Sequence, residues 1–152
     1  MKRRSYVSCY FEPAGDACEN IVGFISRCEK RLDICAYYLT SNAITTAIAG
    51  AVKRKVKVRI LADKTNSSSK GSDVILFAQA DIPCKVNDKS VRYMHNKFMI
   101  GDKKAIITGS FNFTKNAERN AENIVIVRLL KVVKEYQKEF NRLWEIGEAF
   151  SD

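Results

Sequence analysis

Apolar and polar positions in the first part of the chain follow two periods, which predict strands alternating with amphipathic helices. Val7–Phe11 is a predicted short strand, and the continuous apolar run in Arg31–Leu39 is typical of a strand buried on both faces. Residues 17–30 carry apolar side chains at helical spacing, and residues 42–54 follow the capping sequence Thr-Ser-Asn. With the strand Val56–Ala62, this β-α-β-α-β order predicts parallel strands with helices packed on the sheet.

The remaining elements are shorter and are separated by polar turns. We predict a turn at Pro13–Asp16 with Asp16 as a helix N-cap, a loop at 63–73, a helix at 73–80, a strand at 83–87, a loop at 88–94, a hairpin of Phe98–Ile100 and Ala105–Thr108, a strand at Ile124–Val127 and a helix at 131–146. The chain shows no linker and no internal repeat. We therefore expect a single domain over residues 1–152.

The charge balance indicates a polyanionic partner. The chain has 26 Lys and Arg against 17 Asp and Glu, a net charge of +9, which favours nucleic acid or anionic lipid headgroups. No stretch approaches the roughly 20 apolar residues of a membrane span, and the basic start MKRR is not followed by the apolar region of a signal peptide. The sequence as written predicts a cytoplasmic protein, or a periplasmic or secreted one if a leader has been removed.

The cysteines predict neither a disulfide framework nor a zinc site. Their number is odd and no CxxC spacing occurs; they are Cys9, Cys18, Cys28, Cys35 and Cys84. A reducing compartment explains them most simply, and a Cys9–Cys18 bridge in an oxidising one is the alternative. We expect no metal and no cofactor.

The only histidine of the chain stands in a pattern suited to phosphate chemistry. His95 and Lys97 are separated by one residue, so in an extended segment their side chains share a face, and Ser110 and Asn112 repeat this spacing after the predicted hairpin. If the two strands are neighbours, the four side chains converge at one end of the sheet. Gly109 is expected to let the backbone approach a ligand closely. The set supplies a nucleophile or acid/base, a cation and two neutral hydrogen-bond groups, which suit a tetrahedral phosphate.

The string His95-x-Lys97-x4-Asp102-x6-Gly109-Ser110-x-Asn112 resembles the HKD signature of the phospholipase D superfamily at every position. The flanking segments 93–98, 107–114 and 120–123 are similar to the single-HKD branch, which holds the bacterial Nuc-type endonucleases and the mitochondrial cardiolipin hydrolases of the Zucchini type. The resemblance implies an α/β sandwich in which helices flank a central mixed, mostly parallel sheet. It also implies a homodimer whose active site lies on the two-fold axis.

The resemblance implies a role for each residue of the motif. One His95 attacks phosphorus to form a phosphohistidine, and the His95 of a second copy acts as acid and then as base. Lys97 and Asn112 bind the non-bridging oxygens, Ser110 contacts the phosphate or the histidine, and Glu122 orients the imidazole. Asp102 belongs to the signature, but its predicted place in a hairpin turn indicates a structural role.

The zinc insertion of animal cardiolipin hydrolases is absent, because only EPAGDACEN links the first strand to the first helix. This compactness and the basic surface favour an endonuclease without sequence specificity, acting on single- or double-stranded DNA or on RNA. The residues expected to bind substrate are Lys57, Arg59, Lys64, Lys70, Arg92 and Lys115. The alternative is a lipid phosphodiesterase acting on cardiolipin or phosphatidylcholine, and a nucleic-acid-binding protein that cuts poorly is a third hypothesis.

Overall fold

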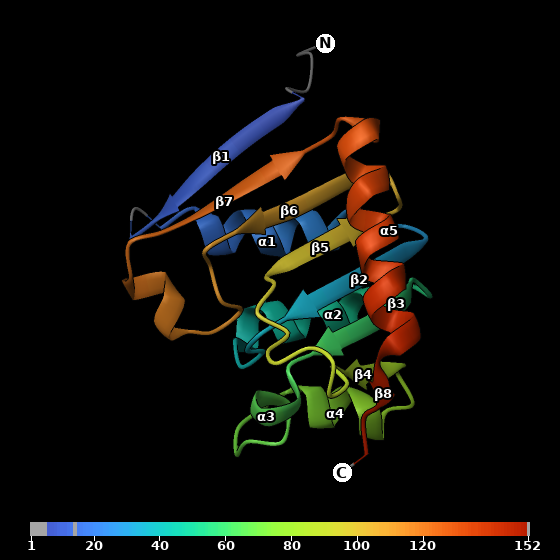
Figure 1. Ribbon diagram of the computed structural model, residues 1–152. Helices are drawn as coiled ribbons and strands as arrows, with labels where there is room; N and C mark the ends of the chain where they lie inside the picture. The colour runs from blue at the N-terminus through green and yellow to red at the C-terminus, as the bar shows by residue number, and fades with distance from the viewer. Residues whose placement is uncertain (1–5, 14, 152) are drawn as a thin grey trace.

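The computed structural model describes residues 6–13 and 15–151, and their strands form one mixed sheet (Figure 1). The strands are β1 (Val7–Glu12), β2 (Arg31–Ala36), β3 (Lys57–Ala62), β4 (Cys84–Val86), β5 (Phe98–Gly101), β6 (Ala105–Gly109), β7 (Glu122–Val127) and β8 (Glu148–Ala149). Their order across the sheet is β1-β7-β6-β5-β2-β3-β4-β8. The helices are α1 (Ala17–Ser26), α2 (Asn42–Lys53), α3 (Lys64–Ser67), α4 (Val74–Gln79), the 3₁₀ helix η1 (Asn116–Arg119) and α5 (Leu130–Ile146).

The mixed sheet confirms the predicted fold class but corrects one part of it, since most neighbouring strands are not parallel. Within the described residues, only β2–β3 and β3–β4 pair in parallel, and the other five neighbouring pairs are antiparallel. The predicted β-α-β-α-β run does place β1, β2 and β3 in the same direction. However, β5, β6 and β7 insert between β1 and β2, so those two strands are not neighbours in the sheet.

Helices cover both faces of the sheet. In Figure 1, α5 crosses the front of the sheet, whereas α1 and α2 lie behind it. The front core contains Cys35, Leu61, Phe98 and Ile106 together with Phe140 of α5. The rear core joins α1, α2 and α4 to the opposite side chains of the same strands, such as Ile34 and Ile60. The central strands are thus buried on both faces, as the apolar run after Arg31 predicted.

Local hydrogen bonds explain where two helices begin. Ser41 caps α2 by accepting from the Ile44 N–H, as the Thr-Ser-Asn sequence predicted. Asp16 occupies the N-cap position of α1, but its carboxylate instead accepts from the Phe11 N–H. The buried Glu12 takes over the capping, since it accepts from the Cys18 N–H at 3.1 Å. Ala14, in the middle of the predicted turn, and residues 1–5 lie outside the described residues.

All five cysteines are free in the structure, including Cys9 and Cys18. Burial raises the pKa of the Cys28 and Cys84 thiols to about 12, so both behave as small apolar side chains. No helix among the described residues is both long and apolar enough to cross a membrane.

Candidate active site

The predicted phosphate-chemistry residues meet at the end of the sheet where the parallel strands β2 and β3 finish. Phe98, at the start of β5, pairs with Cys35 near the end of β2 and with Thr108 near the end of β6. Gly109, the last residue of β6, pairs with Ile124 near the start of β7. Because these strand ends meet, the segments that carry His95, Lys97, Ser110, Asn112 and Glu122 lie at one edge of the sheet. Ligands of open α/β sheets commonly bind at this edge.

His95 and Lys97 form a compact pair beside an aromatic ring. The Lys97 Nζ lies 3.4 Å from Nδ1 and 3.5 Å from Nε2 of His95 and donates to the His95 carbonyl at 2.7 Å. The edge of the Tyr37 ring contacts the imidazole, with the ring centroids 4.4 Å apart, and the same ring lies 5.1 Å from Nζ. Partial burial lowers the pKa of Lys97 below its usual value, and the charge of Glu122 opposes this shift. The imidazole itself is exposed to solvent.

Ser110 and Glu122 are joined by a short hydrogen bond in which the serine hydroxyl donates to the carboxylate. The Asn123 N–H donates to the same hydroxyl at 3.1 Å, and the Asn120 side chain donates to the other carboxylate oxygen at 3.3 Å. These bonds tie the end of β6 to the start of β7. Ser110 is therefore held in one orientation beside the site.

Asn112 lines a polar cavity next to these groups. The other lining residues are Tyr38, Thr40, Thr114, Lys115, Asn116 and Asn120. The Asn112 Oδ1 is buried without a hydrogen-bond partner among the described residues. An unpaired buried polar atom costs free energy, and turning the amide would present its NH₂ donors in the same position. Either orientation gives Asn112 capacity for a polar ligand.

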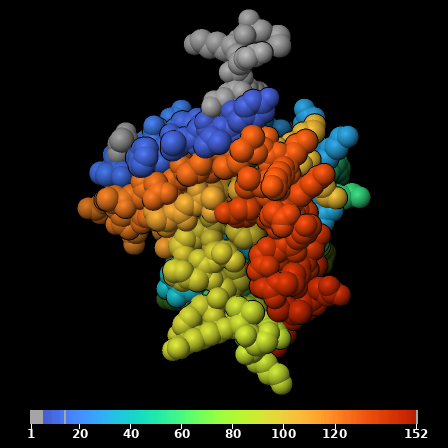
Figure 2. Space-filling view, turned by 45° about the horizontal axis from the view of Figure 1, so that its top comes forward, coloured from blue at the N-terminus to red at the C-terminus, as the bar shows by residue number. Residues whose placement is uncertain are grey.

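A buried carboxylate positions the segment that leads into His95. Asp63, 1% exposed, follows β3 and caps α3 by accepting from the Asn66 N–H at 3.1 Å. Its second oxygen accepts from the Met94 N–H at 3.1 Å. Met94 is itself buried, so the residue before His95 is fixed by packing and by a hydrogen bond. The yellow part of Figure 2, around residue 95, reaches the molecular surface between β7 in orange and α5 in red.

Comparison with known proteins identifies the family. The model described as "Cardiolipin synthase, PLD-like domain" matches residues 21–144. A phospholipase D of Rickettsia prowazekii is 41% identical over 141 residues, covering 91% of this chain and 68% of the relative. A mitochondrial cardiolipin hydrolase of Chlamydomonas reinhardtii is 30% identical over 139 residues, covering 91% of this chain and 62% of the relative.

A solved structure extends this likeness to three dimensions. Nuc from Salmonella typhimurium, a phospholipase D family member, superimposes with a TM-score of 0.89 at 27% identity. The match covers 96% of this chain and 98% of Nuc. The chain belongs to the phospholipase D superfamily. It is therefore a phosphodiesterase of that superfamily, and the segments that carry His95, Lys97, Ser110 and Asn112 meet at one edge of its sheet.

Two residues of the HKD string, Gly109 and Asp102, contact the backbone of neighbouring segments. Gly109 was expected to let a ligand approach, but a Cβ there would lie 2.1 Å from the Asn123 carbonyl oxygen. The close approach in the structure is thus that of the neighbouring strand β7, and the approach of a ligand to Gly109 stays a prediction. Asp102 lies in the β5–β6 hairpin, as predicted, and accepts from the N–H groups of Glu29, Lys30 and Arg31 at 2.7–3.0 Å. Burial acts to raise the pKa of Asp102, but these N–H donors outweigh burial and hold it below its usual value.

The predicted substrate-binding cations divide into two groups. Lys115 lines the Asn112 cavity, Lys64 directly follows Asp63, and Lys70 and Arg92 are exposed in the loops between β3 and β5. Lys64 also pairs with Glu148 at 2.5 Å. These four lie in segments that follow or precede the strand ends at the site, and their role in substrate binding stays a prediction.

Lys57 and Arg59 do not lie at the site, contrary to the prediction. Lys57 starts β3 and is therefore at the opposite end of the sheet. Arg59 was expected to bind substrate, which requires an exposed side chain. Val58 faces the rear core, so Arg59 points to the front face, and α5 covers that face. Arg59 is 19% exposed and donates to the fully buried Asp33 at 2.8 Å. Alternation along a strand identifies a face, but it does not show whether another element covers that face.

Three residues of the site were missed. Tyr37 contacts the histidine, Asp63 anchors Met94, and Asn120 binds Glu122. Tyr37 and Asp63 each follow a buried parallel strand, and this position is the signal that could have identified them. Asn120 follows the short helix η1, for which the sequence shows no clear periodicity. Among the described residues, no three His, Cys, Asp or Glu side chains are grouped so that they could hold a metal ion.

Proposed function

We propose that the protein is an endonuclease that hydrolyses DNA, and RNA as a second substrate, without sequence specificity and without a metal. The observation that carries the proposal is the polar and cationic surroundings of His95. Lys97 lies beside the imidazole, and the adjacent Asn112 cavity is lined by hydroxyl, amide and ammonium groups, including Lys115. Such surroundings suit a charged phosphodiester with sugars on both sides.

The first chemical step is a displacement at phosphorus. The unprotonated nitrogen of one His95 attacks, a nitrogen–phosphorus bond forms, and the bond from phosphorus to the leaving oxygen breaks. The protonated His95 of the partner subunit gives its proton to that oxygen. In the second step the same histidine of the partner subunit removes a proton from water. The resulting hydroxide attacks phosphorus and releases the first His95.

The neighbouring groups stabilise the charge that develops on the non-bridging oxygens. Lys97 supplies a fixed cation next to the imidazole, and Asn112 supplies amide donors. The Ser110 hydroxyl donates its proton to Glu122 and accepts from the Asn123 N–H, so in the single subunit it holds Glu122 in place. In the single subunit Glu122 is engaged by Ser110 and Asn120. Its predicted hydrogen bond to His95 is therefore part of the proposal.

A homodimer provides the second histidine, because the chain contains only one. An exposed apolar sheet face supports this assembly. Val7 and Phe11 of β1 are 44% and 57% exposed, and in register they lie beside Val127 and Asn123 of β7. Asn123 in turn binds Ser110. The uncovered face is thus continuous with the candidate active site, as a shared site on a two-fold axis requires.

The test is cleavage of labelled single- and double-stranded oligonucleotides in excess EDTA. We compare the wild type with His95→Ala and with Asn96→Ala, an exposed neighbour that serves as the matched control. The wild type and the control should cut, and His95→Ala should lose activity by at least about 10³-fold, as when a nucleophile is removed. Denaturing the enzyme at alkaline pH during turnover of a phosphorus-labelled substrate should trap a phosphohistidine, which is stable in alkali, only when His95 is present. Cutting by His95→Ala, or cutting that requires a metal, would contradict the mechanism.

Two relatives favour a second candidate function. The Rickettsia protein carries the name phospholipase D, and the Chlamydomonas protein carries the name mitochondrial cardiolipin hydrolase. The same histidine chemistry would then release phosphatidic acid from cardiolipin or phosphatidylcholine. Vesicles of each lipid are therefore incubated under the same conditions and assayed for phosphatidic acid. Lipid hydrolysis that is lost in His95→Ala, without oligonucleotide cleavage, would replace the nuclease with this function.

A further inference from the structure

The end of the molecule opposite the candidate active site carries a second concentration of positive charge. We call it the hairpin end, because the β5–β6 hairpin lies there beside the first residues of β2 and β3 and the last residues of α1 and α2. Its exposed cations include Arg27, Lys30, Lys55, Lys57, Lys103 and Lys104. The six-residue strand β2 separates the two ends by on the order of 20 Å.

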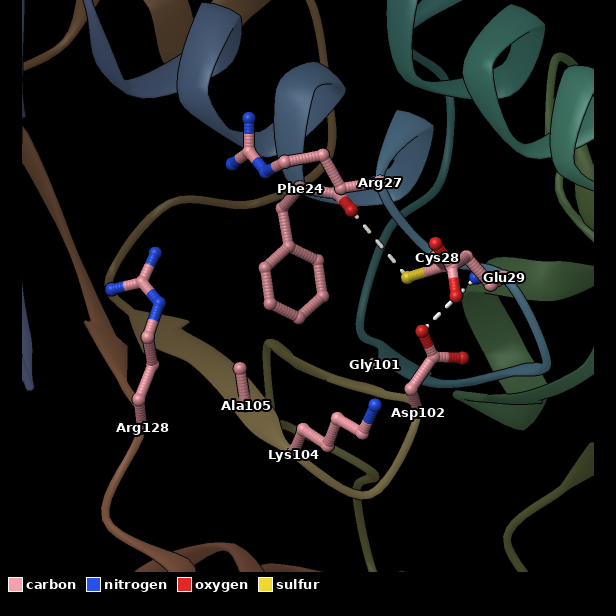
Figure 3. Close-up of a pocket in the computed structure, with 9 residues that line it drawn as sticks. All are labelled: Phe24, Arg27, Cys28, Glu29, Gly101, Asp102, Lys104, Ala105 and Arg128. Atoms are coloured by element: carbon pink, nitrogen blue, oxygen red, sulfur yellow. Dashed lines mark hydrogen bonds between the residues drawn. The ribbon is translucent and has the colours of Figure 1, made fainter. Parts of the chain in front are cut away.

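The cations of the hairpin end form one continuous surface. Figure 3 shows Arg27, Lys104 and Arg128, from three different segments, around a cavity of about 230 Å³ that is also lined by Phe24. A second hollow beside it is lined by Lys30, Lys55, Lys57 and Lys103. Glu29 and Asp102 line both hollows.

The two acidic residues offset only part of this charge. Asp102 keeps its negative charge, but three backbone N–H groups hold its carboxylate toward residues 29–31. Glu29 is the other carboxylate among the lining residues. The hairpin end therefore presents a positive surface with Glu29 as its one outward acid among the residues that line these two hollows.

Exposed apolar side chains stand next to these cations. Leu129 and Leu130, which begin α5, are 42% and 58% exposed, and Tyr6 is 69% exposed. The Arg128 N–H donates to the Tyr6 carbonyl at 2.8 Å, which joins the tyrosine to the lining of the cavity in Figure 3. Exposing large apolar side chains to water costs free energy, so covering them with another apolar surface is favourable.

We propose that the hairpin end docks on the surface of an anionic lipid bilayer. Basic side chains are attracted to anionic headgroups, while adjacent leucine and tyrosine side chains enter the boundary between headgroups and acyl chains. Nucleic acid would match the cations but would leave Leu129, Leu130 and Tyr6 without a partner. The docked protein holds its candidate active site on the side away from the bilayer. This orientation is separate from the question of which phosphodiester is cleaved.

The test is flotation with phosphatidylcholine vesicles prepared with and without phosphatidylglycerol, in EDTA. All binding measurements use His95→Ala protein, so that lipid hydrolysis cannot change the vesicles. The protein should bind only the vesicles that contain phosphatidylglycerol. Lys30→Glu with Lys104→Glu should weaken binding by more than about 30-fold, because the two lost cations account for roughly 1 kcal/mol each and the two new carboxylates are repelled by the anionic headgroups.

A second variant tests the apolar contribution without harming the fold. Leu129 occupies the N-cap of α5 and makes no side-chain cap, so Leu129→Ser places a favourable capping residue there. Leu129→Ser with Leu130→Gln should weaken vesicle binding by about 10-fold. The control is Lys138→Glu with Arg142→Glu, an equal charge change on the exposed side of α5. It should weaken binding by less than about 3-fold.

Each other outcome overturns the proposal. If vesicle binding weakens equally in the Lys30/Lys104 variant and in the control, the effect is one of net charge and not of this surface. Loss with the lysine variant but none with the leucine variant, together with weakened oligonucleotide binding, would assign the surface to nucleic acid. If the protein does not bind anionic vesicles, a lipid bilayer is excluded as the partner of the hairpin end. Oligonucleotide cleavage by the same variants with His95 present should be unchanged, so failure here is distinct from failure of the proposed function.

Discussion

A buried ion-pair network at the interface between the sheet and α5 gives the sharpest stability prediction. Asp33 is fully buried and accepts two hydrogen bonds from Arg59, each at 2.8 Å, and one from Gln137 at 2.9 Å. The guanidinium of Arg59 lies 4.7 Å from the Phe140 ring centroid and 5.1 Å from that of Trp144. One carboxylate thus joins β2 to β3 and both strands to the helix.

The perturbation is Asp33→Asn, which keeps the shape of the side chain and removes its charge. Removing one partner of a buried pair costs about 3–5 kcal/mol, because the other charge is left uncompensated. Arg59 is 19% exposed and stacks on two rings, which reduces this cost. We therefore expect a loss of about 3 kcal/mol in the free energy of unfolding at pH 7, and a melting temperature lower by about 6–12 °C.

The pH dependence has a definite sign. Burial acts to raise the pKa of Asp33, but the hydrogen bonds and charges of Arg59, with help from Gln137 and Arg31, hold the pKa below its usual value. The stabilisation is therefore present above about pH 4, the usual pKa, and is lost as the pH falls through the lower pKa of the folded state. The difference between wild type and Asp33→Asn should be largest at pH 7 and shrink in acid.

The assay is urea unfolding at pH 7 and at a series of lower pH values. Glu145→Gln, an exposed carboxylate on the same helix, is the control and should change the free energy of unfolding by less than about 0.5 kcal/mol. A loss below about 1 kcal/mol for Asp33→Asn at pH 7 would refute the reasoning. So would a difference between the two proteins that grows as the pH is lowered.

Three further predictions follow from single contacts. Gly109→Ala should destabilise the fold by about 3 kcal/mol in urea unfolding, because its Cβ would lie 2.1 Å from the Asn123 oxygen, and an unchanged midpoint would contradict this. Asp102→Ala should cost about 1–2 kcal/mol, since it frees three partly exposed N–H groups. Because the pKa of Asp102 in the folded state lies below its usual value of about 4, this difference should begin to shrink only below about pH 4. A difference that already shrinks between about pH 7 and pH 5 would count against it. Because the pKa of Lys97 is lowered, the cleavage rate should fall with rising pH before the usual lysine pKa of about 10.4 is reached, as Lys97 loses its proton. Lys97→Arg should be slower but should keep its rate through that range, because arginine stays charged. Parallel pH–rate profiles of the two proteins would contradict this.

The strands and helices could be predicted closely because their periodicity is local. Helix α2 was placed at 42–54 and is found at Asn42–Lys53, and the predicted helix 131–146 is found at Leu130–Ile146. The strand β2 was extended to Leu39 but ends at Ala36, because Tyr37 and Tyr38 leave the sheet to line the site. The elements α3, η1 and β8 have two to four residues each, too few to show a period.

Strand order and burial could not be predicted in the same way. The convergence of His95 with Ser110 was predicted from spacing within one hairpin, which is a local feature. The insertion of β5, β6 and β7 between β1 and β2 depends on contacts between distant segments. The position of Arg59 depends on α5, which lies more than 70 residues later in the chain. A rule based on alternating positions carries no information about that helix.

The direction of the helices explains why the two ends of the sheet differ chemically. Helix α2 connects the parallel strands β2 and β3 and so runs opposite to them, which places its N-terminus at the candidate active site and its C-terminus at the hairpin end. At the N-terminal side, Thr40 and Ser41 donate to the carbonyl of Phe113, the neighbour of Asn112. The partial positive charge there favours an anionic phosphodiester. At the other end, the partial negative charge favours the cations that follow, and Arg54 donates to the carbonyls of Ile25 and Cys28. The same backbone dipole therefore favours negative charge at one end of the sheet and a basic surface at the other.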